Sequence, residues 1–168
     1  MRQQWYSVSL GATAVLLCIL FDQLSKLWVL EFSTGNDYYP LFSWLNIHVV
    51  WNKGVAFSLL SQPQLAWMLL IVVTLLIVSL WWVGLRGLYR GGCIHRYSAL
   101  LLICAGGSAN WLDRVFYGAV IDFIYVHYGN WYWPTIFNVA DIYVVLGCFY
   151  FISYDYMKSM AKSHARHK

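Results

Sequence analysis

Long apolar runs alternate with short polar segments along the chain, and this pattern predicts four membrane-crossing helices. A spanning helix needs about 20 predominantly apolar residues, and each of the four runs is long enough. The runs cover residues 9–30, 65–85, 97–117 and 138–156. We expect them to form a single integral membrane domain over residues 1–168.

The segments between these runs contain two stretches that favour β-strands. Residues Leu41–Trp51 follow a period of two and are followed by a turn at Asn52–Gly54. Residues Ala119–Val126 are rich in β-branched and aromatic side chains and precede a break at Tyr128–Asn130. The expected fold is therefore an all-α membrane protein with a small β element resting on the membrane surface.

Composition supports a membrane protein and excludes several other classes. Of 168 residues, 61% are hydrophobic and 11% are charged, and mean hydropathy is +0.57. Soluble proteins carry about 25% charged residues, so this chain lacks the polar surface of a soluble domain. Its length excludes a two-domain enzyme. The formal net charge of +4 does not indicate nucleic-acid binding, because the basic residues form no continuous stripe.

The basic residues instead report the orientation of the helices. They cluster before the first run, between the second and third, and after the fourth: Arg2; Arg86, Arg90 and Arg96; Lys158, Lys162, Arg166 and Lys168. Cytoplasmic loops carry the excess of Lys and Arg. Both termini and residues 86–96 are therefore expected in the cytoplasm, with residues 31–64 and 118–137 outside.

The first apolar run resembles a secretory signal peptide, because Arg2 precedes the apolar residues Leu10–Leu20. No small-x-small cleavage site follows at a suitable distance, so we expect an uncleaved helix. The four cysteines lie in the spans or in the cytoplasmic loop, which predicts neither a disulfide framework nor a metal site.

Four of the seven acidic residues lie in or beside the predicted spans: Asp22, Asp113, Asp122 and Asp141. A charge inside a membrane costs about 2.5–3.5 kcal/mol on insertion scales, so each needs a partner or a function. At about 1.5 Å per helical residue, all four converge on the outer leaflet.

Helical spacing supplies partners for some of these acids. Asp22 and Lys26 are four residues apart with the acid first, the favourable order for an ion pair. A structural pair is a better explanation of them than catalysis. Asn110 and Arg114 share the same spacing, with Asp113 on the adjoining face. Arg114 with Asp113 could be a brace or a substrate contact.

Two acids have environments that separate their proton affinities. Asn138 can cap the fourth helix and place Asp141 at the positive end of the helix dipole, which favours its ionised form. Apolar neighbours surround Asp122 and raise its pKa by desolvation. Such a difference is what acid–base chemistry requires, although capping alone also explains the spacing of Asn138 and Asp141.

Four blocks of the sequence stand out together: FDQLSK at 21–26, WNKGVAF at 51–57, GGSANWLDRVFYGAVIDF at 106–123 and FNVAD at 137–141. Together they resemble the bacterial lipoprotein signal peptidase family, signal peptidase II. The blocks occur in the family's order, and the chain length and the four spans also match.

The resemblance implies an intramembrane aspartic endopeptidase of the bacterial inner membrane with its site toward the periplasm. It would cleave diacylglyceryl-modified prolipoproteins just before the modified cysteine, using Asp122 and Asp141 without a metal or organic cofactor. The prolipoprotein and membrane phospholipid are the implied partners. The outer segments correspond to the family's periplasmic antiparallel sheet and short helix. Supporting or binding positions are Asp22, Lys26, Asn52, Gly54, Asn110, Asp113, Arg114 and Asn138. The helix dipole favours Asp141 as the base, and which aspartate is base and which is acid stays open.

Two other functions are compatible with buried charges. A small ion- or proton-coupled transporter should carry polar residues at several depths, whereas the inner halves of the last three predicted helices contain almost none. A membrane assembly factor would use its charges only to hold helices together.

Overall fold

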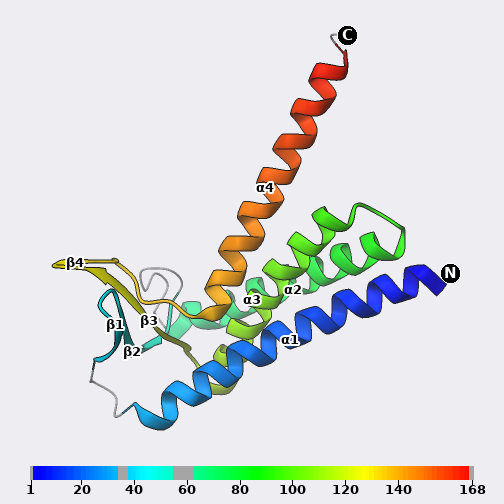
Figure 1. Ribbon diagram of the computed structural model, residues 1–168. Coiled ribbons are helices and arrows are strands. Elements are labelled where there is room, and N and C mark those ends of the chain that lie inside the picture. The colour runs from blue at the N-terminus through cyan, green and yellow to red at the C-terminus, as the bar shows by residue number, and fades with distance from the viewer. Residues whose placement is uncertain (1, 34–37, 55–62, 167–168) are drawn as a thin grey trace.

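The computed structural model describes residues 2–33, 38–54 and 63–166. Within them, four helices and four strands follow one another in the order α1, β1, β2, α2, α3, β3, β4 and α4. Figure 1 shows the strands gathered at one end of the helices, whereas both chain termini lie away from the sheet. The junction between the helices and the sheet is therefore remote from both termini.

The four predicted apolar runs correspond to the four helices. The helices are α1 (Arg2–Phe32), α2 (Pro63–Tyr89), α3 (Ile94–Tyr117) and α4 (Val139–Arg166). Each helix begins before or ends after its apolar run, because backbone hydrogen bonding continues where the side chains become polar. Residue 138, the first of the fourth run, lies just before α4.

Three helical segments in the described part of the chain are long and apolar enough to cross a membrane. They are Arg2–Phe32, Leu70–Tyr89 and Val139–Ser163. Helix α3 is outside this group, and it carries Asn110, Asp113 and Arg114. It packs against all three other helices, so its polar side chains can face protein instead of lipid.

Helix α3 packs most closely on α4 through glycines. A Cβ atom on Gly106 would clash with the Ala140 carbonyl oxygen of α4. One on Gly147 of α4 would lie 2.7 Å from Ile103 Cγ1 of α3. Small residues let membrane helices approach closely, and here they bring the start of α4 against the polar part of α3.

The strands form one antiparallel sheet in the order β1 (Tyr39–Phe42), β2 (Leu45–Asn52), β3 (Val120–Tyr128) and β4 (Trp131–Tyr132). Its buried face packs on the end of α1 around a cluster made of Val29, Ile47, Val49, Ile121 and Phe123. The pairing of Val50 with Asp122 places the start of β3 beside the end of β2.

The structure corrects two details of the predicted outer segments. The single strand predicted over residues 41–51 is a hairpin, with β1 and β2 joined by a turn at Ser43 and Trp44. Alternating hydrophobicity cannot reveal this reversal, because both strands of a hairpin have the same period. The short helix implied outside the membrane is absent from the described residues 38–54 and 118–137. Residues 55–62 lie outside the described ranges.

Candidate active site

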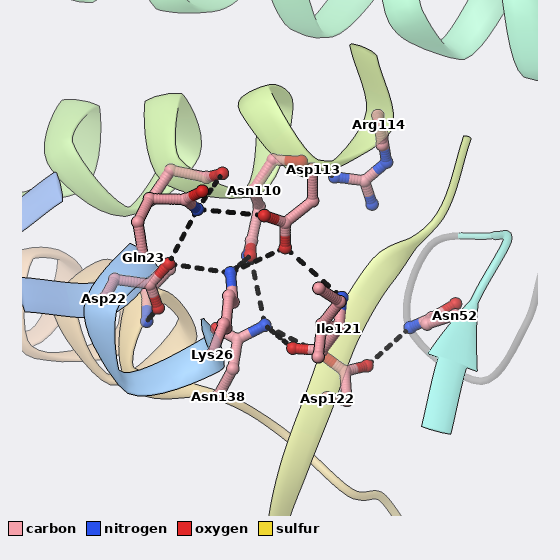
Figure 2. Close-up of polar contacts among 12 residues, drawn as sticks. Asp22, Gln23, Lys26, Asn52, Asn110, Asp113, Arg114, Ile121, Asp122 and Asn138 are labelled. Atoms are coloured by element: carbon pink, nitrogen blue, oxygen red, sulfur yellow. Dashed lines mark hydrogen bonds and ion pairs between the residues drawn. The ribbon is translucent and has the colours of Figure 1, made fainter. Parts of the chain in front are cut away.

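A lysine lies buried between two aspartates where α1 meets α3 (Figure 2). Lys26 Nζ is 2.7 Å from Asp22 Oδ2 and 2.7 Å from Asp113 Oδ2. Lys26 is 1% exposed and both carboxylates are fully buried. We call these three residues the buried ion triad. The predicted pair of Asp22 and Lys26 is confirmed, and α3 supplies a second acid.

The buried ion triad contains two acids and one base, so it needs further hydrogen-bond donors. Asp113 Oδ1 accepts a bond from Gln23 Nε2 at 2.9 Å, and Asp113 Oδ2 accepts one from the Ile121 N–H at 3.2 Å. Asp22 Oδ1 accepts a bond from the Ala140 N–H at 2.7 Å. The triad is thereby bonded to β3 and to α4 as well as to its own helices.

Asn138 caps the N-terminus of α4, as its spacing predicts. The Asp141 N–H donates to Asn138 Oδ1 at 3.0 Å, and the Asn138 N–H donates to Asp141 Oδ2 at 3.1 Å. This reciprocal arrangement is a capping box, which satisfies two backbone donors at the helix start. It also fixes the Asp141 carboxylate at the positive end of the helix dipole.

The same asparagine reaches a second carboxylate. Asn138 Nδ2 donates to Asp122 Oδ1 at 2.7 Å and to Asn110 Oδ1 at 3.0 Å (Figure 2). Asn110 Nδ2 donates in turn to Asp141 Oδ1 at 2.9 Å. Asn138 therefore contacts Asp122 through its side chain and Asp141 through its backbone, and it connects two acids that are 19 positions apart in the chain.

Asp122 occupies an environment that favours its protonated form. It is 4% exposed, and Asn52 Nδ2 of β2 donates to its Oδ2 at 3.0 Å. Burial raises the pKa of Asp122 to about 7, and the Asp141 carboxylate adds to the rise against the opposing hydrogen bonds. This direction agrees with the expectation from its apolar neighbours.

Both carboxylates line a pocket of about 870 Å³ at the junction of the helices and the sheet. Its polar lining includes Asn52, Asn110 and Arg114. Apolar side chains supply much of the remaining wall, among them Val50, Val120, Val126, Ile142, Val145 and Leu146. Among the described residues, no three His, Cys, Asp or Glu side chains are grouped to hold a metal ion. The pocket could therefore hold an apolar ligand against two acids.

Arg114 bonds to backbone oxygens and not to its neighbour Asp113. Its guanidinium donates to the Gly54 carbonyl oxygen at 3.1 Å and to the Asn110 carbonyl oxygen at 3.2 Å. Within the described ranges the only ion-pair partner of Asp113 is Lys26. Consecutive helical residues point in different directions, which explains why the brace considered from the sequence does not form.

The structure brings all ten residues singled out in the sequence into one connected region. The sequence reasoning missed Gln23, which donates to Asp113 and to the Ala109 carbonyl oxygen at 3.2 Å. Its position three residues before Lys26, on the same helical face, was the available signal. It also missed the backbone N–H groups of Ile121 and Ala140, which no sequence pattern reveals.

Fold and site together define an integral membrane protein with two linked carboxylates in a pocket at one end of its helices. The family model described as signal peptidase (SPase) II matches residues 14–157. The lipoprotein signal peptidase of Janthinobacterium sp. (strain Marseille) is 35% identical over 154 residues, which cover 91% of this chain and 90% of that protein. That of Methylorubrum extorquens (strain PA1) is 39% identical over 144 residues, covering 82% and 80%.

A solved structure of a bacterial membrane enzyme has the same fold. It superposes with a TM-score of 0.75 at 23% identity and covers 95% of this chain and 92% of that chain. The family match extends over most of the sequence, and the relatives exceed 30% identity over most of both chains. This chain belongs to the signal peptidase II family. That membership does not favour the transporter alternative.

Proposed function

We propose that this chain removes the signal peptides of lipoproteins by an aspartic mechanism that uses Asp122 and Asp141. The observation that carries the proposal is the hydrogen bonding of Asn138 to both carboxylates at the wall of one pocket. The substrate is a prolipoprotein with a diacylglyceryl-modified cysteine, and the chain is cut just before that cysteine. Residues 1–168 act as one peptidase domain.

Protonated Asp122 acts as the acid and ionised Asp141 as the base. The raised pKa of Asp122 and the position of Asp141 at the helix N-terminus support this assignment. Two neighbouring carboxylates titrate as a pair, so one proton is shared between two sites near neutral pH. One acid and one base are the groups that peptide hydrolysis by water requires.

In the first step, Asp141 removes a proton from a water molecule, and the water oxygen bonds to the carbonyl carbon before the modified cysteine. Asp122 gives its proton to the carbonyl oxygen, which yields a neutral tetrahedral diol. In the second step, the proton on Asp141 passes to the amine nitrogen while the carbon–nitrogen bond breaks. A diol proton returns to Asp122, so both carboxyl groups regain their starting states.

The pocket suits an acylated substrate. Its apolar wall is formed by side chains of the sheet, of the segment between β4 and α4, and of α4 itself, and the two carboxylates line the same pocket. The remote position of the two termini, together with the basic residues near them, supports a pocket that faces the periplasm. A lipid-modified cysteine anchored in the outer leaflet, among the membrane phospholipids, could reach it there.

The test is cleavage of a purified diacylglyceryl-modified prolipoprotein by the purified full chain in detergent. Asp122→Asn and Asp141→Asn are compared with wild type at equal amounts of folded protein. Asp155→Asn is the matched control, because Asp155 pairs with Arg96 at 3.4 Å and does not line the pocket. We expect the control to retain activity and each site variant to lose at least about 1,000-fold in kcat.

Two results would contradict the proposal. If folded wild type fails to cut the modified substrate, the proposed peptidase function is ruled out. If both variants still cut before the modified cysteine, the peptidase function stands but the aspartic mechanism is ruled out.

A further inference from the structure

Two backbone N–H groups next to the proposed catalytic acids are held by the buried ion triad. The Ile121 N–H, which immediately precedes Asp122, donates to Asp113 Oδ2 at 3.2 Å. The Ala140 N–H, which immediately precedes Asp141, donates to Asp22 Oδ1 at 2.7 Å. The same type of contact is therefore made at the corresponding position beside each acid.

Lys26 connects these two contacts. Its ammonium lies 2.7 Å from each of the carboxylates that accept the two N–H bonds. The backbone before Asp122 is thus linked to the backbone before Asp141 through Asp113, Lys26 and Asp22 in sequence. These links join β3 to α4 through side chains of α3 and α1, and α1 is far from the other three elements in the chain.

Gln23 fixes the orientation of one of these carboxylates. Its Nε2 donates to Asp113 Oδ1 at 2.9 Å and to the Ala109 carbonyl oxygen at 3.2 Å. With Oδ1 held in this way, Asp113 Oδ2 faces both Lys26 and the Ile121 N–H (Figure 2). Gln23 therefore prevents rotation of the group that holds β3.

None of these four side chains lines the pocket. Lys26 is 1% exposed and the two carboxylates are fully buried. A role in contacting substrate is thus excluded for the triad by geometry. A backbone bridge between Ile124 and Phe137 links β3 to the segment before α4 on the other side of Asp122. The triad supplies the link on the side nearer α1.

We infer that Asp22, Lys26, Asp113 and Gln23 are positioning residues that set the separation and orientation of Asp122 and Asp141 by holding the N–H groups of Ile121 and Ala140. The inference rests on the proposed function of the two acids. A misplacement of about 1 Å at a reacting group can lower a rate about 100-fold, so the effect is measurable.

The test compares substitutions that keep or remove the hydrogen-bond acceptor. Asp22→Asn and Asp113→Asn retain a side-chain oxygen that can accept the N–H bond, whereas Asp22→Leu and Asp113→Leu do not. We expect the Leu variants to lose about 100-fold in kcat per folded molecule with KM close to wild type. The Asn variants should recover much of this loss.

Gln23→Leu provides a readout should the Leu variants at positions 22 and 113 fail to fold. It leaves both acceptors and the whole triad in place, and we expect a lower kcat with unchanged KM. The matched control is Ser108→Ala, at another position on α3. It removes the hydroxyl that accepts a 3.4 Å hydrogen bond from Trp81 Nε1, and Ser108 contacts neither acid. The control should keep the wild-type kcat.

A second readout separates positioning from stability. Looser spacing weakens the repulsion between Asp122 and Asp141, so the upper pH limit of kcat should move to lower pH in Gln23→Leu, which changes no charge. The inference is overturned if Gln23→Leu and the folded Leu variants at positions 22 and 113 change only the melting temperature while kcat per folded molecule and its pH profile stay at wild-type values. Wild type that does not cleave would contradict the proposed function instead.

Discussion

Asp122 and Asp141 are chemically identical side chains that the fold places in different surroundings. Asp122 lies on a strand at 4% exposure, whereas Asp141 lies in the first turn of a helix and accepts two N–H bonds. The difference between an acid and a base thus comes from the environment and not from the residue type.

This difference predicts how activity depends on pH. The pKa of Asp122 is raised to about 7, so its proton is present below that pH and is lost as the pH rises through it. We expect kcat to fall as the pH rises through about 7, because the acid is then ionised. Initial rates at saturating substrate between about pH 5.5 and about pH 8.5 measure this. A rate that stays constant across this range would count against Asp122 as the acid.

At the residue scale, sequence spacing identifies contacts made within one helix. The pairs Asp22 with Lys26 and Asn138 with Asp141 were predicted because their partners lie three or four residues apart. The contact of Lys26 with Asp113 was not predicted, because it depends on how α1 packs on α3. Backbone donors such as the Ala140 N–H carry no signature in the sequence.

At the scale of elements, α3 can approach α4 closely because a glycine of α3 stands where the two helices meet. Gly106 faces the backbone of Ala140, which cannot move without displacing the start of α4 and with it Asp141. The neighbouring Gly107 faces only Ile77, at 3.4 Å from an added Cβ. Two adjacent glycines in the same helix thus differ in the space around them.

We therefore expect Gly106→Ala to lower both the melting temperature and the cleavage rate, with a destabilisation of about 1–3 kcal/mol from overpacking. Gly107→Ala is the matched control and should behave like wild type, since its methyl group makes an ordinary van der Waals contact. Thermal unfolding in detergent and the cleavage assay measure the two effects. Equal stability of the two variants would contradict the packing argument.

The helices could be predicted from the sequence more completely than the strands. A run of about 20 apolar residues can satisfy its backbone hydrogen bonds within a membrane by forming a helix, which is why all four helices were located. The hairpin of β1 and β2 was missed because a turn at Ser43 and Trp44 contains neither Gly nor Pro.

At the scale of the whole molecule, the proposed orientation rests on the basic residues and the position of the sheet. Residues 93 and 128 are separated by α3 and part of β3, so they should lie on opposite sides of the membrane if α3 crosses it. Cys93 is partly exposed in the loop before α3, and Tyr128 is 83% exposed near the end of the sheet.

We expect a membrane-impermeant maleimide to label Tyr128→Cys in intact cells and to label Cys93 only after the inner membrane is permeabilised. Cys93→Ser is the control that identifies the native thiol. Labelling of both positions from the same side would mean that α3 does not cross. Labelling of Cys93 alone in intact cells would reverse the orientation.

The polarity of α3 also bears on how the protein is assembled. A segment that carries Asn110, Asp113 and Arg114 gains little by entering lipid alone, so its insertion requires neighbours that cover these groups. Synthesis from the N-terminus delivers α1 first, so Lys26 is already in the membrane when Asp113 leaves the ribosome. The end of the chain, made last, then supplies Asn138 together with α4. The pocket is therefore completed only at the end of biosynthesis, which limits the time during which an unfinished chain could bind a substrate.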